Sequence, residues 1–97
     1  MDWDKIKRVS SVKEGRTTGT VGITPAVAIT PGKGFAAVRV TNTNSSALKT
    51  VRISPDGGST WFDTPANSER MFGAMDLLSV KGSEAAVVYD IEYLKRQ

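Results

Sequence analysis

The sequence has neither cysteine nor histidine among its 97 residues. Without cysteine it can form no disulfide bond and no thiolate metal site. Without histidine it lacks the most common general base and the most common metal ligand. These two absences remove most enzyme mechanisms, and we expect a protein that is not an enzyme and holds no metal ion or other cofactor. A Ca²⁺ site with oxygen ligands near Asp56 and Asp63 is the minor alternative, because hard cations require neither cysteine nor histidine.

Long apolar runs are also missing. No segment approaches the roughly 20 apolar residues that span a bilayer. The first residues, Met1-Asp2-Trp3-Asp4-Lys5, lack the hydrophobic region of a signal peptide. We therefore expect a soluble chain that starts at Met1 and has no membrane partner. Its 97 residues suffice for one compact domain but not comfortably for two.

The charges are unevenly distributed along the chain. Residues 15–55 contain five cations and no acid, namely Arg16, Lys33, Arg39, Lys49 and Arg52. From residue 56 onward seven acids outnumber four cations. The favoured interpretation is that neighbouring strands of opposite charge pair across a sheet. The alternative is a head-to-tail contact between copies, in which basic and acidic surfaces meet.

Aromatic residues make up only 7% of the sequence. A nucleic-acid interface of a small barrel combines aromatic side chains with a clustered basic face. Here the cations are spaced singly, and the few aromatic residues must also build the core. A nucleic-acid partner is therefore not expected.

Alternation of apolar and polar residues predicts strands through most of the chain. The clearest is 35–42, in which Ala36, Val38 and Val40 share one face and Phe35 lies on the other. Further strands are predicted at 48–54, 59–63, 75–80 and 85–94. In the last of these, one face carries Val87, Tyr89, Ile91 and Tyr93.

Turn-forming segments rich in Gly, Pro, Asn and Ser separate these runs. They lie at residues 30–34, 42–46, 55–58, 64–68 and 81–83. Short strands at such spacing, without a convincing helix between them, predict an all-β fold. We expect a single antiparallel β-sandwich or jelly-roll-like domain over residues 15–97, with one possible helical turn at 68–73.

The N-terminal residues have a different pattern. Trp3, Ile6 and Val9 recur at a spacing of three, which suits a short amphipathic helix or an arm over residues 1–14. An N-terminal strand at a sheet edge is the alternative for the first 24 residues. The candidate residues for an assembly interface are Trp3, Ile6, Val9, Val12 and Arg16.

The most specific motif is Ser54-Pro55-Asp56-Gly57-Gly58-Ser59-Thr60-Trp61. It resembles the Asp-box of sialidase-type propellers, whose defined positions match Ser54, Asp56, Gly58, Thr60 and Trp61. The resemblance implies a structural hairpin and no catalytic role, and 97 residues are too few for a propeller with blades of about 40 residues. An alternative use of Trp61, with Phe62 and the neighbouring loops, is to stack on a carbohydrate.

A wider resemblance covers most of residues 24–94. The segments that carry it are 29–34, 40–43, 53–62 and 78–82. In this order of strands and turns the chain is similar to small virion proteins of tailed bacteriophages. The resemblance implies a non-enzymatic structural protein that decorates or cements the capsid, or joins the neck or tail. It also implies other virion proteins as partners, a homo-oligomer in the assembly, and a virion location after synthesis in the host cytoplasm.

Overall fold

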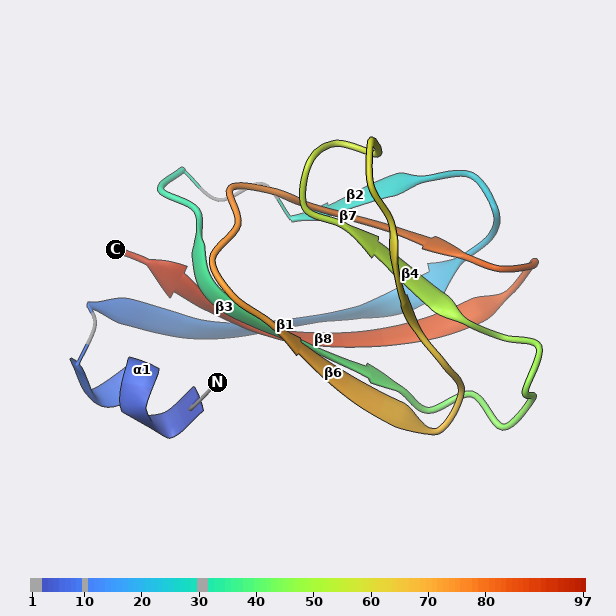
Figure 1. Ribbon diagram of the computed structural model, residues 1–97, viewed down its shortest axis with the longest axis horizontal. Coiled ribbons are helices and arrows are strands. Elements are labelled where there is room, and N and C mark those ends of the chain that lie inside the picture. Colours follow the sequence, from blue (N-terminus) through green and yellow to red (C-terminus); the bar gives the residue numbers. More distant parts are fainter. Residues whose placement is uncertain (1–2, 10, 30–31) are drawn as a thin grey trace.

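The computed structural model describes residues 3–9, 11–29 and 32–97. One short helix, α1 (Trp3–Val9), precedes eight strands (Figure 1). The strands are β1 (Val12–Val21), β2 (Ala26–Ile29), β3 (Phe35–Asn42), β4 (Val51–Ser54), β5 (Phe62–Thr64), β6 (Ser68–Phe72), β7 (Leu78–Gly82) and β8 (Val87–Arg96). Within the described ranges, no helix has the length and apolar character to cross a membrane.

The strands form two four-stranded antiparallel sheets. Sheet A has the order β1-β8-β3-β6 and sheet B the order β2-β7-β4-β5. The pairs are nested, because β1 pairs with β8, β2 with β7, β3 with β6 and β4 with β5. This nesting of eight strands in two sheets is the topology of a jelly roll. The prediction of an all-β sandwich is therefore confirmed, and the strand order, which the sequence left open, is now defined.

Apolar side chains from the two sheets meet in one core. From sheet A they include Val38, Val40, Val87 and Ile91, and from sheet B they include Val51, Ile53, Leu78 and Val80. Phe35 belongs to the same core and is fully buried. The prediction that Phe35 faces away from Val38 and Val40 is wrong, because the register of β3 against β8 shifts between Phe35 and Ala37. Such an irregularity reverses the alternation on one side of it.

The predicted face of β8 is confirmed. Val87 and Ile91 lie in the core, and Tyr89 and Tyr93 pack against it. Opposite the two tyrosines on β1 stand Gly19 and Gly15. A Cβ atom at Gly15 would lie 2.2 Å from the Tyr93 ring, so the missing side chain makes room for the aromatic ring.

Several predicted boundaries differ from the structure. The strands predicted at 48–54, 59–63, 75–80 and 85–94 are β4, β5, β7 and β8, and each of them begins two or three residues later than predicted. The helical turn considered at residues 68–73 is wrong, because β6 covers this segment and pairs with β3 from Val38 to Asn42. The arm predicted for residues 1–14 is a helix only as far as Val9, and β1 begins at Val12. β1 lies at the edge of sheet A, as the alternative of an N-terminal edge strand predicted. The predicted turn at residues 30–34 begins with Thr30 and Pro31, which are outside the described residues.

Two buried asparagines connect the sheets near the end of β3. The Asn42 side chain donates hydrogen bonds to the carbonyl oxygens of Lys49, 2.8 Å away, and Thr64, 2.9 Å away. Its own oxygen accepts from the side chain of Asn44 at 2.6 Å. Asn44 in turn bonds both the amide and the carbonyl of Val88. The sequence suggested only a turn at 42–46, but these side chains anchor the following loop to both sheets.

Candidate functional site

The first candidate surface is the outer face of sheet A, where α1 lies against β3 (Figure 1). Ala37 and Leu94 stand opposite each other on β3 and β8. Both are fully buried although neither belongs to the core between the sheets. The outer face of the sheet therefore has a small apolar patch of its own at the end where the helix sits.

Charged contacts connect the helix with this face. The Trp3 ring lies 4.6 Å from the Arg39 guanidinium, and Arg39 forms an ion pair with Glu92 on β8 at 2.9 Å. Lys7 forms an ion pair with Glu14 on β1 at 2.8 Å. The hydrogen bond to Glu14 raises the pKa of Lys7. Both contacts link α1 to strands of its own chain.

The five residues expected at an assembly interface lie on two elements, with Trp3, Ile6 and Val9 on α1 and Val12 and Arg16 on β1. Trp3 and Ile6 are half-buried on α1, beside their own sheet. Val9 ends the helix, and its side chain is outside the described part of the chain. Val12 starts β1 opposite Arg96, and Arg16 forms an ion pair with Asp90. The helix is thus held within the molecule, and an interface of these residues would require it to move or to contribute only its exposed side.

Cations and acids from the two oppositely charged parts of the sequence form ion pairs between neighbouring strands. Arg16 bonds Asp90 through two nitrogens, with Nε 2.9 Å from Oδ1. Arg39–Glu92 and Arg52–Asp63 are further pairs of this kind. Each joins a cation from residues 15–55 to an acid from the later part of the chain. The interpretation that strands of opposite charge pair across a sheet is confirmed.

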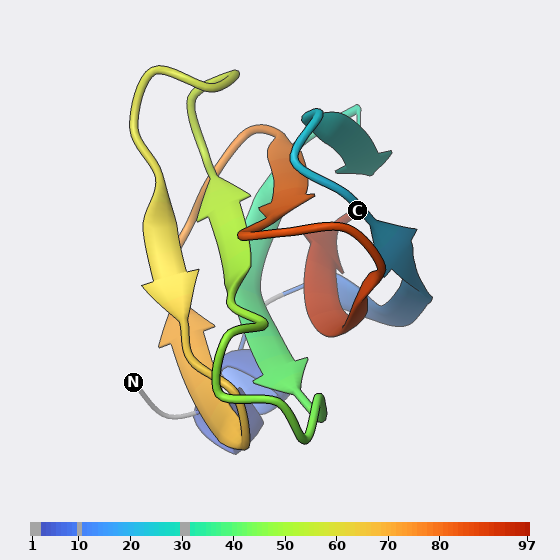
Figure 2. The same cartoon turned by 90° about the vertical axis from the view of Figure 1, so that its right-hand side faces the viewer.

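The second candidate surface is formed by the edges of the sheets. Sheet A ends in β1 and β6, and sheet B ends in β2 and β5. Figure 2 shows β1 and β2 on one side of the molecule and β5 and β6 on the opposite side. β1 has 10 residues, whereas β2 has four, β5 three and β6 five. Edge strands are usually short or interrupted by charge or proline, yet Thr17–Val21 has neither.

The hairpin loop between β4 and β5 has the hydrogen bonds of a self-contained turn. The Ser54 hydroxyl donates to Asp56 Oδ1 at 2.7 Å and accepts from the Gly58 amide at 2.8 Å. The Thr60 amide donates to the same carboxylate oxygen at 2.9 Å. The bonds from Ser54 and Thr60 hold the pKa of Asp56 below its ordinary value. Gly57 and Gly58 have φ angles of 77° and 104°, which favour glycine.

Trp61 closes this loop and is half-buried. The Lys81 ammonium lies 4.2 Å from the centre of its ring. The same ring also packs against Gly58, where an added Cβ atom would lie 3.6 Å from it. A ring with a cation on one face offers less surface for stacking on a sugar than a free tryptophan does.

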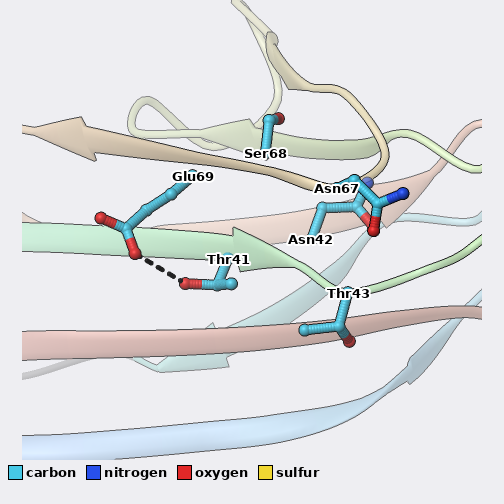
Figure 3. Close-up of a pocket in the computed structure, with 6 residues that line it drawn as sticks. All are labelled: Thr41, Asn42, Thr43, Asn67, Ser68 and Glu69. Atoms are coloured by element: carbon cyan, nitrogen blue, oxygen red, sulfur yellow. Dashed lines mark hydrogen bonds between the residues drawn. The ribbon is translucent and has the colours of Figure 1, made fainter.

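An open pocket of about 330 Å³ lies beside the end of β3 and the start of β6. Six residues with polar side chains line it, namely Thr41, Asn42, Thr43, Asn67, Ser68 and Glu69 (Figure 3). The Thr41 hydroxyl donates to Glu69 Oε2 at 3.3 Å. This lining supplies a single carboxylate, whereas carboxylate acid-base catalysis requires a pair. In the described part of the chain, no three acidic side chains gather in a way that could hold a metal ion.

Comparison with known proteins relates the chain to others by fold alone. No known protein family matches the sequence, and no curated protein matches it. Among solved structures, the chain is similar to one from Bacillus endospore appendages, which are described as a novel family of disulfide-linked pili. The TM-score is 0.61 and the identity 11%, over 88% of this chain and 86% of that one. At this identity the likeness shows that the two chains share a fold.

Proposed function

We propose that the protein is a non-enzymatic structural subunit of a tailed-phage virion, which stabilises the capsid or a neck or tail assembly. Its mechanism is association alone. A small domain present in many copies strengthens a shell because each copy contacts several neighbours. The proposed location is the virion, after synthesis in the host cytoplasm, and the proposed partners are other virion proteins and further copies of this chain.

The observation that carries this proposal is the long edge strand β1. An edge of 10 residues presents unpaired backbone groups that can bind a strand of another subunit. Its uncharged half, Thr17–Val21, lacks the charges and prolines that usually prevent such pairing. This edge is therefore suited to pairing with a strand of another subunit.

The residues that the structure describes contain no evident catalytic constellation, which is compatible with a non-enzymatic role. The sequence has no histidine or cysteine, and the pocket beside β3 and β6 has only Glu69 as a titratable side chain. The similar fold of a chain from pili is compatible with a structural role, although the disulfide linkage of those pili is not available here. Assembly of this protein would not use disulfide bonds.

The alternative function is a carbohydrate-binding module that uses Trp61. It has less support, because Lys81 already lies over the ring and the loop holds Trp61 against Gly58. Replacing Trp61 with Ala separates the two functions. Loss of glycan binding by a folded variant would favour the module, whereas a large loss of stability would favour a structural role for Trp61.

The first test is the mass of the protein in solution by light scattering, followed by co-sedimentation with purified capsids, necks and tails. We expect the protein to pellet with one of these assemblies and to saturate it at a fixed number of copies per particle. A variant lacking residues 1–10 measures the contribution of α1 and leaves β1 complete, since β1 begins at Val12. A protein that stays monomeric and remains in the supernatant with every particle would contradict the proposal.

A further inference from the structure

We infer that copies of the protein associate head to tail, with β1 of one copy paired to β6 of the next so that sheet A continues through both. This inference rests on the proposed function, because it specifies the self-association of the same subunit. The surface involved is the side formed by β1 and β2, and its partner is the side of a second copy formed by β5 and β6 (Figure 2).

The directions of the strands permit this pairing when the second copy is moved across the sheet and turned to follow its twist. All neighbours in sheet A are antiparallel, and the sheet has four strands, so its edge strands β1 and β6 run in opposite directions. A copy moved in this way therefore places its β1 antiparallel to β6. Sheet B also has four antiparallel strands, and the same movement brings β2 of the second copy beside β5. Repetition of this movement without closure produces an open filament.

The register of sheet A determines which side chains would meet. Val38 stands opposite Tyr93 on one side and Phe72 on the other, and Tyr93 stands opposite Gly15. A movement of this kind without a shift along the strands therefore aligns Phe72 with Gly15 of the next copy. Residues that face the core in one copy then meet core-facing residues of the next copy, as a sheet that continues through both copies requires.

On the outer face, this register is favoured by charge. Arg16 of the second copy would stand opposite Met71, and its diagonal neighbour on β6 would be Glu69. Diagonal neighbours across a strand pair are within reach of long side chains. The Arg16 side chain is 62% exposed, and Glu69 is exposed as well. The Glu69 carboxylate, bonded at 3.3 Å to Thr41, can therefore attract Arg16 of a neighbour.

The side chains on the inner face of β6 are held in place by contacts within the protein. The Arg70 guanidinium lies 5.2 Å from the Phe62 ring and 5.0 Å from the Phe72 ring, and it donates to the Asp63 carbonyl at 3.1 Å. The two rings are themselves 5.9 Å apart. This cluster links the edges β5 and β6, so a second copy meets a fixed surface and loses less side-chain entropy on binding.

The test uses two variants, each of which blocks one edge with proline. Proline is tolerated on an edge strand only where the N–H group points away from the sheet. Neighbouring residues on a strand point their N–H groups to opposite sides. One of Thr17→Pro and Thr18→Pro should therefore keep the melting temperature of the parent and block β1. One of Arg70→Pro and Met71→Pro should likewise block β6.

Sedimentation velocity then measures the mass of each variant and of a 1:1 mixture. We expect the parent to form oligomers larger than dimers as its concentration rises, and each blocked variant to stay at the 10.4 kDa of a monomer. The mixture should form a heterodimer, because each variant retains the edge that the other has lost. A β6-blocked variant that still dimerises would overturn the inference in favour of β1 pairing with itself. A mixture that stays monomeric would also overturn it.

A substitution on the exposed side of β6 gives a second test that does not depend on proline. Glu69→Lys should weaken self-association at least tenfold at low salt, because the new cation opposes Arg16 of the neighbour. Glu69→Gln is the matched control and should have a smaller effect. Equal self-association of the parent and Glu69→Lys would contradict the proposed register.

The inference and the proposed function can fail separately. A parent protein that stays monomeric at all concentrations, yet pellets with a virion assembly, would overturn the head-to-tail contact and keep the proposed function. A protein that forms head-to-tail oligomers but pellets with no virion assembly would support the contact and contradict the virion role.

Discussion

Helix α1 and the hairpin loop at residues 54–61 are both short, and both have a sequence signal, but they are stabilised in different ways. In the loop, donors and acceptors are only two or four positions apart, as in the bonds from Gly58 and Thr60 to Ser54 and Asp56. The helix has seven residues, and an isolated helix of this length is unstable in water. It depends on contacts with strands that lie elsewhere in the sequence, such as the one between Trp3 and Arg39. Local bonds thus define the loop, whereas the finished sheet defines the position of the helix.

The largest effect is expected in the loop. Ser54 is fully buried, and its hydroxyl serves Asp56 and the Gly58 amide. Ser54→Ala removes the acceptor of the Gly58 amide and leaves Asp56 Oδ1 with the bond from the Thr60 amide, and it should lower the free energy of unfolding by about 1–3 kcal/mol. Chemical denaturation measures the change. Ser59→Ala, at an exposed serine of the same loop, is the control, and an equal loss for both variants would contradict the role of Ser54.

Deletion of residues 1–10 should have the next largest effect. It removes α1 and exposes the patch of Ala37 and Leu94, which should cost about 1–2 kcal/mol. The domain should still unfold in a single cooperative transition, because its core lies between the sheets. Chemical denaturation and tryptophan fluorescence from Trp61 measure this. A variant that fails to fold would show that the helix is essential to the sandwich.

A smaller effect is expected from protonation of Asp56, because this side chain is exposed. Its pKa is lowered in the folded protein, so its contribution to stability is present above its unfolded pKa and is lost as the pH falls through the folded pKa. The difference in melting temperature between the parent and Asp56→Asn should be largest at neutral pH. It should shrink as the pH falls below about 4. A difference that stays constant from pH 7 to pH 2 would contradict the role of the carboxylate.

The smallest effect is expected for Trp3→Ala. It removes the contact between the ring and Arg39 and should lower the free energy of unfolding by about 0.5–1 kcal/mol. Trp3→Phe keeps an aromatic ring and should lose less. Chemical denaturation of both variants and of the deletion variant lacking residues 1–10 gives their losses in unfolding free energy. The ratio of these losses shows how much of the stabilisation by α1 comes from Trp3. A loss for Trp3→Ala that exceeds the loss for the deletion would contradict this account.

The sequence predicted strands well where alternation is regular. The predicted strand at 35–42 has the bounds of β3, and the inward face of β8 is as expected. It predicted the wrong face for Phe35, because the register shift after this residue depends on the pairing with β8. The sequence also contained no indication of β6 (Ser68–Phe72), because this strand has a charged residue, Arg70, on its inner face. The Arg70 guanidinium lies there against the rings of Phe62 and Phe72. No pattern within β6 itself indicates these partners.

The candidate surfaces were foreseen only in part. The spacing of Trp3, Ile6 and Val9 indicated an amphipathic helix, but an exposed arm and a helix docked on its own sheet have the same spacing. The segment Asn42-Thr43-Asn44 indicated a turn, but the two asparagines also bond Thr64 and Val88, which lie far along the chain. The direction of each edge strand could not be predicted, because it follows from the strand order.

By itself the sequence determined the local features of this protein, namely the strand alternation, the turns, the short helix and the loop held by Ser54 and Asp56. These depend on residues a few positions apart. Only the tertiary structure decided the nested strand order, the pairing of β6, the patch beneath α1 and the exposure of β1. These depend on contacts between distant residues, such as Arg39 and Glu92, which are 53 positions apart. Such contacts exist only when both sheets have formed, and no short stretch of sequence specifies them.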